Sequence, residues 1–493
     1  MSSKGFDAII VGSGSGGGPL AYELSKAGKK VAIIEAGGFY TTNDFNRFEL
    51  LQLRKLWWKP RWTQNYEIGY EDEIGLGMGR CVGGGTTIFT AVAARAPEFN
   101  FKEWHEATRI QNENGEPFSQ EELSPFYDSV ERDTNVRKYT EWDDGLKKIN
   151  TGFTKIGHPF SPVNAFISEK CDQSGCLYGC PTEAKRGTLV SYIIPAVYLG
   201  AQVFPNSTVT KILFSRENGP KAEGVEFTNE NGEATRFYSK IVVLAAGAMN
   251  TPLILLDSGI EEIAGNTRSV DQIGRNFAVN TAAIVFGRFE EVLNNWLIHP
   301  LSGHVTEFCQ KEKGGFLLEA SEVMEGPLSF SEVIVDEEGI PLWGERQKQI
   351  MKDYRHYAGI FINIHDGNDG RVFRDPDTKM EKFHKPVTQE DKKRFSSARV
   401  MCKEALLAGG AKETLDTVYL SHHVQGSCRM GEDSSRSVVD STCESHDIKN
   451  LYIADGSVIP SVLDVNPSLT IMAFSKRLAK YLLSNVLNDV SAS

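Results

Sequence analysis

The sequence predicts an α/β protein built from two parts. The first is a Rossmann-like nucleotide-binding unit assembled from discontinuous segments, and the second is an α+β unit with a mixed or antiparallel sheet. Three observations predict this fold class. A glycine-rich turn joins apolar segments within residues 6–35, further apolar segments occupy 241–247 and 451–456, and apolar residues alternate more loosely across 275–440.

The first 35 residues have the pattern of a βαβ unit. Residues 6–12 form an apolar run that ends in glycine, residues 20–27 have helical spacing, and residues 31–35 contain a second apolar run. The turn after the first run has the spacing Gly12-x-Gly14-x-x-Gly17. Glycines at this spacing permit a tight turn, a close approach of the backbone to a pyrophosphate and close helix–strand packing.

Glu35 follows the second apolar run, where a carboxylate can bind a ribose 2′-hydroxyl and disfavours a 2′-phosphate. A glycine turn alone is also consistent with a flexible loop. Because strand, helix, second strand and acidic residue occur here in order, we predict that this unit binds a dinucleotide. The motif does not distinguish NAD from FAD.

Three segments in the middle of the chain extend this unit. Residues 209–214 and 222–227 alternate like a hairpin, and residues 241–247 form another buried strand. Thr251 and Pro252 follow, and proline in the first turn is typical of a helix that starts at this point.

The last part of the chain returns to the same pattern. Residues 451–456 read as a strand that ends in a turn, and 469–483 have the periodicity of a final helix. We therefore expect one domain from residues 1–274 together with 441–493, and a second domain from residues 275–440.

The composition excludes several classes of partner. The chain has 493 residues, of which 40% are hydrophobic and 24% charged, and is long enough for two packed domains. Its net charge of -12 argues against nucleic acid or an anionic membrane as the main partner. No apolar run approaches the ~20 residues of a membrane span, and the first run ends in glycines rather than at a cleavage site. We expect no membrane span and a cytoplasmic location.

Several segments resemble the glucose–methanol–choline (GMC) oxidoreductases. Residues 79–88 resemble the family's first signature, 247–260 its second, and 274–277 a further short element. The block from His423 through Asn466 to Thr470 is also similar to that of the family. Since the matched blocks reach both ends of the chain in the family's order, the resemblance implies the family's fold, FAD as cofactor and oxidation of alcohols. It makes residues 275–440 the substrate-binding domain.

The residues that we expect to bind FAD lie in the glycine turn, the first signature and the loops beside the later strands. They are Gly12, Gly14, Ser15, Gly17, Glu35, Arg80, Gly83, Gly84, Thr86, Val209, Ala246, Asp455, Asn466, Pro467 and Thr470. In the family, a residue at the position of Asp455 meets the cofactor phosphates. Phe89 stands where the family often has Asn or His, so no His–flavin bond can form there and we predict noncovalent FAD.

His423 is the residue that we expect to act as catalytic base. An imidazole can accept an alcohol proton while hydride leaves the same carbon. A lone histidine is more often structural, but the spacing from His423 to Met430 matches the family's catalytic block, whereas His422 is displaced by one residue. Asn466 stands where the family has a His or Asn partner, and its amide can orient the substrate oxygen. The alternative is an asparagine that caps a turn.

Three of the eight cysteines lie together, at Cys171, Cys176 and Cys180 in a loop spanning residues 165–190. Soft ligands at this spacing suit an iron–sulfur cluster, and the spacing resembles that of GMC dehydrogenases that hold a [3Fe-4S] cluster and pass electrons to a haem partner. A structural zinc would need a fourth ligand, for which His158 is a candidate. A cysteine-bearing loop without metal is an equal alternative.

Together these features predict a FAD-dependent dehydrogenase that oxidises an alcohol or sugar hydroxyl, with His423 as base. The cysteines favour a non-oxygen acceptor, such as an electron-acceptor protein or small subunit. An oxidase that forms hydrogen peroxide is the main alternative. A lyase that uses flavin structurally and an NAD-binding module are the others. Polar and aromatic residues within 275–440 favour a sugar or glycoside over a long alkyl chain.

Overall fold

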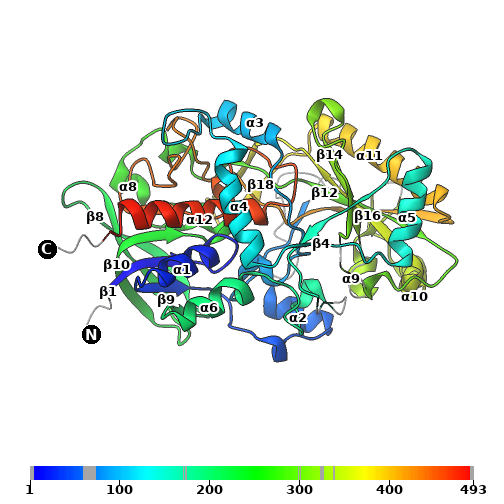
Figure 1. Ribbon diagram of the computed structural model, residues 1–493, viewed down its shortest axis with the longest axis horizontal. Coiled ribbons are helices and arrows are strands. Elements are labelled where there is room, and N and C mark those ends of the chain that lie inside the picture. The colour runs from blue at the N-terminus through cyan, green and yellow to red at the C-terminus, as the bar shows by residue number, and fades with distance from the viewer. Residues whose placement is uncertain are drawn as a thin grey trace.

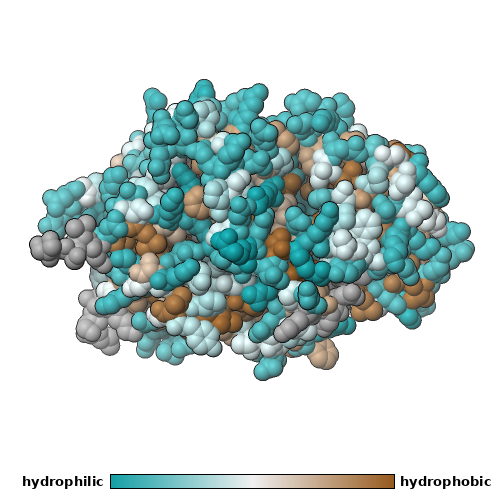
Figure 2. All heavy atoms as spheres, viewed as in Figure 1, coloured by the Kyte–Doolittle hydropathy of each residue, from teal (hydrophilic) through white to brown (hydrophobic). Residues whose placement is uncertain are grey.

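The computed structural model describes residues 5–58, 74–169, 171, 175–297, 299, 301–321, 327–336 and 339–488. Two large sheets organise these residues (Figure 1). The first sheet lies in the half of the molecule that holds both termini, and the second lies toward the opposite end. The face in Figure 2 is mostly hydrophilic, with hydrophobic side chains only in small patches. Within the described ranges, no helix has the length and apolar character that crossing a membrane requires.

Seven strands form the first sheet, and five of them are parallel. Their bounds are β1 Gly5–Val11, β2 Val31–Ile34, β7 Gln202–Phe204, β8 Thr208–Ser215, β9 Lys221–Thr228, β10 Ala234–Leu244 and β21 Leu451–Ile453. The order is β7-β2-β1-β10-β9-β8, and β21 pairs with β10. The central strands are continuous apolar runs because a parallel sheet is covered on both faces.

The two ends of the chain pack together over this sheet. Helices α1 (Gly17–Lys26), α4 (Gln120–Asp133) and α12 (Ser468–Asn485) lie side by side in Figure 1. Lys476 of α12 is buried and forms ion pairs with Glu23 of α1 and Asp133 of α4. This pairing satisfies the buried ammonium and ties the C-terminal helix to the N-terminal βαβ unit.

Nine strands form the second sheet. Their bounds are β3 Ile74–Leu76, β5 Ser161–Pro162, β12 Ala282–Arg288, β13 Gly303–Val305, β14 Phe316–Ser321, β15 Ile334–Val335, β16 Tyr357–Ile364, β19 Glu413–Thr417 and β20 Tyr419–Ser421. The main path is β15-β19-β12-β16-β14-β13-β5, with β20 paired to both β12 and β3. All of these pairings are antiparallel except that of β20 with β3.

Alternation along β12 separates the two faces of this sheet. Val285 packs in the apolar cluster that α5 and α11 cover, whereas Ile284 and Phe286 pack in the cluster that holds residues of α9 and α10. These helices are α5 Asp144–Lys155, α9 Pro327–Glu332, α10 Gly344–Asp353 and α11 Gln389–Ala408.

Smaller elements complete the fold. The strands are β4 Arg137–Lys138, β6 Asn164–Ala165, β11 Arg275–Phe277, β17 Gly370–Arg374 and β18 Glu381–His384. The helices are α2 Glu49–Leu56, α3 Glu98–Thr108, α6 Ile194–Tyr198, α7 Gly247–Asp257 and α8 Ile260–Ala264. Three short 3-10 helices border the site described below, namely η3 Gly84–Thr87, η4 Cys176–Tyr178 and η10 Gly456–Val458.

The predicted fold class is confirmed, and the predicted elements of the nucleotide unit are present, although several boundaries differ. The helix expected to start beside Pro252 is α7, which begins at Gly247 and contains the proline in its interior. Proline cannot donate to the carbonyl four residues earlier, which belongs to Ala248. Ser427 Oγ donates to that carbonyl instead, at 2.5 Å. A tertiary hydrogen bond therefore replaces the missing helical one.

The second sheet is larger than the segment 275–440 that was expected to form it. Strands β3 and β5 precede residue 275 and pair at its margins. The domain boundaries at 274 and 441 stay predictions, because the sheets alone do not define independent domains.

Candidate active site

The first glycine turn passes between the carboxyl ends of the neighbouring strands β10 and β21. Gly12 has a φ of +101°, and a Cβ there would lie 2.3 Å from Ala245 O. A Cβ on Gly16 would lie 1.4 Å from Ala454 O. Only glycine satisfies such contacts. The backbone N–H groups at the start of α1 are consequently presented beside an open space, the arrangement that favours an anionic ligand.

Hydrogen bonds of Ser13 and Glu35 hold this turn against a second glycine loop, which contains Gly83, Gly84 and Gly85. Ser13 donates from both N and Oγ to Glu35 Oε2, at 3.2 Å and 2.7 Å, and Gly37 N donates to Glu35 Oε1 at 2.9 Å. Gly83 N donates to Ser13 Oγ at 2.9 Å. Burial raises the pKa of the Glu35 carboxyl, and these hydrogen bonds oppose that rise.

The second glycine loop, around η3, has backbone on one side and open space on the other. Gly84 has a φ of +52°, and a Cβ there would lie 2.9 Å from Gly14 Cα. The next residue differs, because no atom of the described protein lies within 4 Å of a Cβ built on Gly85. The two loops therefore pack against each other and leave a bare backbone surface facing the cavity.

Asp455 joins the starts of two helical segments. Its Oδ2 accepts from Gly247 N at 2.9 Å and from Thr251 Oγ1 at 2.5 Å, and its Oδ1 accepts from Ser457 N at 2.8 Å. Burial raises its pKa, and the same hydrogen bonds lower it. Asp455 thus fixes α7 and η10 where both face the cavity, a role that the sequence did not predict.

A cavity of about 370 Å³ is bordered both by the glycine turn and by the C-terminal histidine block. The predicted site residues that border it are Gly12, Gly14, Ser15, Glu35, Gly84, Val209, Ala246, His423, Asp455, Asn466 and Pro467. The second sheet contributes Ile284, Phe361 and Leu420 to the same wall. One space therefore connects residues from the two ends of the chain.

The other predicted cofactor-binding residues do not border the cavity. They are Gly17, Arg80, Gly83, Thr86 and Thr470. Thr86 Oγ1 donates to Gly83 O at 2.7 Å, and the Thr470 hydroxyl lies 2.9 Å from a tyrosine hydroxyl. The Arg80 guanidinium lies over the ring of Trp58, 5.1 Å from its centroid, and Trp58 borders the cavity. These residues do not face the cavity, and their contacts help to hold the residues that border it.

His423 and Asn466 meet at the cavity although 43 residues separate them in sequence. His423 Nε2 lies 3.4 Å from Asn466 Nδ2. Because the asparagine nitrogen can only donate, Nε2 is the acceptor and carries a lone pair. Burial, reinforced by the neighbouring His422, lowers the pKa of His423 to about 3. The imidazole is therefore neutral near pH 7, as a base must be before it acts.

His422 has different surroundings. Its ring packs edge-on against Trp57, with 5.8 Å between centroids, and fills the space beside Gly77, where a Cβ would lie 2.2 Å from its Cδ2. His422 also borders the cavity, but the ring 3.4 Å from Asn466 belongs to His423. The role of His423 as the base stays a prediction.

Glu319 is a residue of this site that the sequence analysis missed. It is fully buried on β14, where its Oε2 accepts from Asn363 Nδ2 at 2.9 Å and from Asn466 Nδ2 at 3.5 Å. Oε1 has no hydrogen-bond partner. Burial raises the pKa of Glu319 to about 8, which keeps the carboxyl mainly neutral at pH 7. The sequence feature that could have indicated Glu319 is an acidic residue within an apolar segment that has the pattern of a strand.

Two family models match this chain. The N-terminal model, described as GMC oxidoreductase, matches residues 7–282, and the C-terminal model with the same description matches residues 371–475. The chain belongs to the GMC oxidoreductase family. Its members bind FAD and act on hydroxyl groups, and the matched ranges include both the glycine turn and the His423–Asn466 pair.

Relatives of known name are distant but matched along nearly the whole chain. Long-chain-alcohol oxidase FAO4B of Arabidopsis thaliana is 25% identical, with 98% of this chain and 68% of the relative covered. Long-chain-alcohol oxidase FAO4A of the same plant is 26% identical, with 95% and 67% covered. The crystal structure of pyridoxine 4-oxidase from Mesorbium loti has a TM-score of 0.73 at 17% identity, with 97% and 99% covered, and shows the shared GMC fold.

The three cysteines of this GMC chain do not form a cluster-binding group among the described residues. Within them, the single group of three His, Cys, Asp or Glu side chains close enough to share a metal contains no cysteine. Cys180 Sγ accepts from Lys185 N at 3.3 Å, and Lys185 Nζ donates to Cys176 O. His158, the candidate fourth zinc ligand, pairs with a surface glutamate at 2.5 Å. The iron–sulfur and zinc sites therefore stay predictions.

Proposed function

We propose that this protein is a FAD-dependent oxidase of apolar primary alcohols, with His423 as the catalytic base. The observation that carries this proposal is the single cavity bordered by both the dinucleotide-type glycine turn and the His423–Asn466 pair. A base beside the space that a flavin can occupy suits the removal of a hydroxyl proton at the carbon that is oxidised.

The backbone at the nucleotide end suits a dinucleotide. The N–H groups at the start of α1 would face the pyrophosphate, and the bare surface at Gly84 and Gly85 would lie against the cofactor. Glu35 already accepts three hydrogen bonds, yet a carboxylate offers about four acceptor positions, so a ribose hydroxyl can still donate to it. Phe89 borders the cavity with a side chain that forms no covalent bond to flavin, which supports noncovalent binding.

The residues at the other end can carry the proton chemistry. When the alcohol binds, its hydroxyl takes the place of the hydrogen bond between Asn466 Nδ2 and His423 Nε2. His423 Nε2 then takes the hydroxyl proton as the carbon–oxygen double bond forms, and the released Asn466 hydrogen is donated to the oxygen and stabilises its developing charge. Bound FAD supplies the acceptor for the hydride that leaves the same carbon. An aldehyde results, and the low pKa of His423 favours release of the proton afterwards.

The cavity wall favours an apolar substrate. Ile284, Phe361 and Leu420, on three strands of the second sheet, border the cavity together with Phe89 and Leu301. A sugar would bury several hydroxyl groups against these side chains without hydrogen-bond partners, which costs free energy for each group. The names of the two Arabidopsis relatives agree with a long apolar substrate. We therefore replace the sugar expected from composition with an apolar alcohol.

Oxygen is the acceptor that we propose. The expectation of a non-oxygen acceptor depended on an iron–sulfur cluster, and among the described residues the three cysteines do not lie in a group spaced to share a metal. The named relatives and the solved structure described above are oxidases by title.

The test combines anaerobic flavin reduction with peroxide detection. Flavin bleaching should accelerate along the series from 1-butanol to 1-dodecanol, since each buried methylene contributes up to about 0.8 kcal/mol, and glucose and methyl glucoside should be slow. Air should then restore the yellow flavin with one hydrogen peroxide per alcohol. Faster bleaching by sugars would overturn the substrate class. Turnover with a dye but without peroxide would overturn the acceptor.

A further inference from the structure

The loop that precedes Asn466 is held by side chains rather than by regular secondary structure. Three consecutive backbone N–H groups of this loop each donate to the side-chain carbonyl of an Asn or Gln from elsewhere in the chain. The pairs, with the donor first, are Val462 with Asn368 at 3.0 Å, Leu463 with Gln425 at 3.1 Å, and Asp464 with Asn100 at 3.5 Å. The acceptors come from α3, from the segment after β16 and from the segment after His423.

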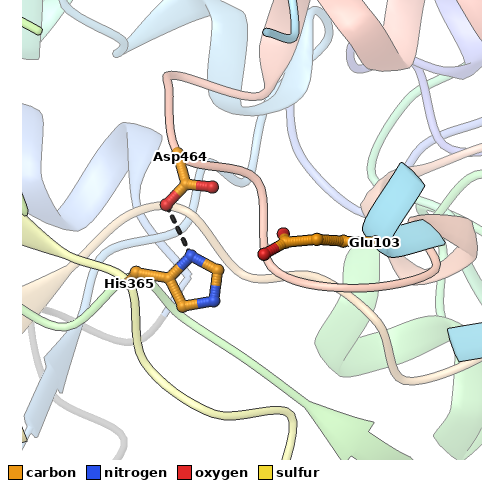
Figure 3. A group of neighbouring side chains, drawn as sticks. All are labelled: Glu103, His365 and Asp464. Carbon is orange, nitrogen blue, oxygen red and sulfur yellow. Dashed lines mark hydrogen bonds and ion pairs between the residues drawn. The ribbon is translucent and has the colours of Figure 1, made fainter. Parts of the chain in front are cut away.

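The carboxylate of Asp464 adds a stronger link to the same loop. His365 Nδ1 lies 2.6 Å from Asp464 Oδ1, and Asn100 Nδ2 donates to Asp464 Oδ2 at 2.7 Å. Figure 3 shows His365 directed at Asp464, with Glu103 approaching from α3. The side chains of His365 and Asp464 are only 5% and 3% exposed, so this link is shielded from solvent. A short, buried, charge-assisted bond is among the stronger single contacts available to a loop.

These residues form a network of protein donors and acceptors. Glu103, His365 and Asp464 have the spacing of metal ligands. However, Glu103 Oε2 accepts from Asn100 Nδ2 at 3.2 Å, and Glu103 Oε1 pairs with Lys311 at 3.3 Å. Both oxygens of Asp464 are likewise occupied, so protein donors already serve each carboxylate that a cation would need.

We propose that His365 and Asp464 are positioning residues for Asn466, and that their buried pair fixes the Asn466 amide against His423. Asp464 lies two residues before Asn466. His365 follows β16, the strand whose Asn363 donates to Glu319, and Glu319 in turn accepts from Asn466. These contacts hold the loop against the second sheet both at Asp464, before Asn466, and at Asn466 itself. The proposal rests on the proposed function, because it requires the His423–Asn466 pair to be the site of proton transfer.

A double-mutant cycle tests this role through the rate of anaerobic flavin reduction per bound FAD. His365→Phe removes the imidazole at similar bulk, and we expect about a 10- to 100-fold lower rate, since a shift of about 1 Å in a positioned group costs that much. In an Asn466→Ala background the same change should alter the rate less than 2-fold, because its target is absent. Asp464→Asn, which keeps an acceptor for His365, should give a smaller loss and serves as the partner variant if His365→Phe does not fold.

The matched control is His158→Phe, which breaks a His–carboxylate pair of 2.5 Å on the surface and should leave the rate unchanged. Equal effects of His365→Phe in both backgrounds would overturn the positioning role. Loss of thermal stability or FAD content with an unchanged rate per bound FAD would also overturn it, since it would show a purely structural residue. If instead His423→Ala and Asn466→Ala both retain full rates, the proposed function fails first, and the two failures are distinguishable.

Discussion

The two ends of the cavity are built in different ways. At the nucleotide end, backbone meets backbone: Gly12 lies against Ala245 O, Gly16 against Ala454 O, and no side chain fits at either position. At the end that we propose to be catalytic, called the catalytic end below, polar side chains from distant segments meet inside an apolar wall. His423, Asn466 and Glu319 come from three separate parts of the chain.

Because of this difference, we expect a substitution at one end to impair a different property of the protein from a substitution at the other end. A change at the nucleotide end acts through steric overlap and affects folding and cofactor retention together. A change at the catalytic end alters protonation or hydrogen bonding and leaves the backbone in place. The three predictions below run from the largest expected effect to the smallest, and each compares fold or cofactor retention with chemistry.

Gly16→Ala should have the largest effect. The added Cβ would lie 1.4 Å from Ala454 O, so the turn or β21 must move. We expect loss of FAD from the purified protein and a large drop in the melting temperature, measured by flavin absorbance and thermal unfolding. Gly5→Ala is the control, because among the described residues no atom beyond its chain neighbours lies within 4 Å of that Cβ. A yellow, stable Gly16→Ala protein would remove the steric distinction between the two ends.

His423→Ala should abolish most of the chemistry and keep the cofactor. Loss of a general base typically costs on the order of 10²–10⁴-fold, so the anaerobic bleaching rate should fall by about that factor while the protein stays yellow. The lowered pKa adds a second expectation. Since the neutral form is active and the pKa is about 3, titration of His423 should not reduce the wild-type rate between pH 7 and pH 5. Full activity of the variant would exclude His423 as the base.

The same division explains what the sequence could predict. The βαβ unit, the glycine contacts and the His423–Asn466 pair were accessible because local spacing or family resemblance carries them. Contacts that depend on which strands become neighbours could not be predicted from the sequence. Glu319 comes to the pair only because β14 pairs with β16, where Asn363 holds it. Asp455 borders the cavity as the cofactor prediction requires, but its hydrogen bonds to α7 and η10 depend on the tertiary fold and were not predicted.

The cysteines mark a limit of sequence spacing. Cys171, Cys176 and Cys180 are close in sequence, which left an iron–sulfur cluster and a metal-free loop as equal alternatives. Sequence spacing fixes only the maximum separation of the sulfur atoms and not the direction of each side chain. Lys185, which donates both to the Cys176 carbonyl and to Cys180 Sγ, gives this loop a structural use that needs no metal.

Glu319→Gln should have the smallest effect, and one that depends on pH. The folded carboxyl has a pKa of about 8, against 4.5 for an exposed glutamate, because burial disfavours its charge. Below pH 4.5 the carboxyl is protonated in both the folded and unfolded states. As the pH rises from 4.5 to 8, the unfolded chain loses this proton while the folded protein keeps it, so the wild type loses stability. The loss is on the order of a few kcal/mol. Glutamine cannot ionise, so the variant should lack this loss.

The difference in melting temperature between Glu319→Gln and the wild type should therefore be several degrees larger at pH 8.5 than at pH 5. Glu113→Gln, at an exposed position, controls for the loss of one acidic group. The activity of Glu319→Gln should change little, because its side-chain oxygen can still accept from Asn363 and Asn466 and leave the second Asn466 hydrogen for His423. A pH-independent difference in melting temperature would mean that Glu319 ionises inside the fold. The catalytic end would then hold a buried negative charge beside its base, and the argument for a neutral, apolar wall would have to be abandoned.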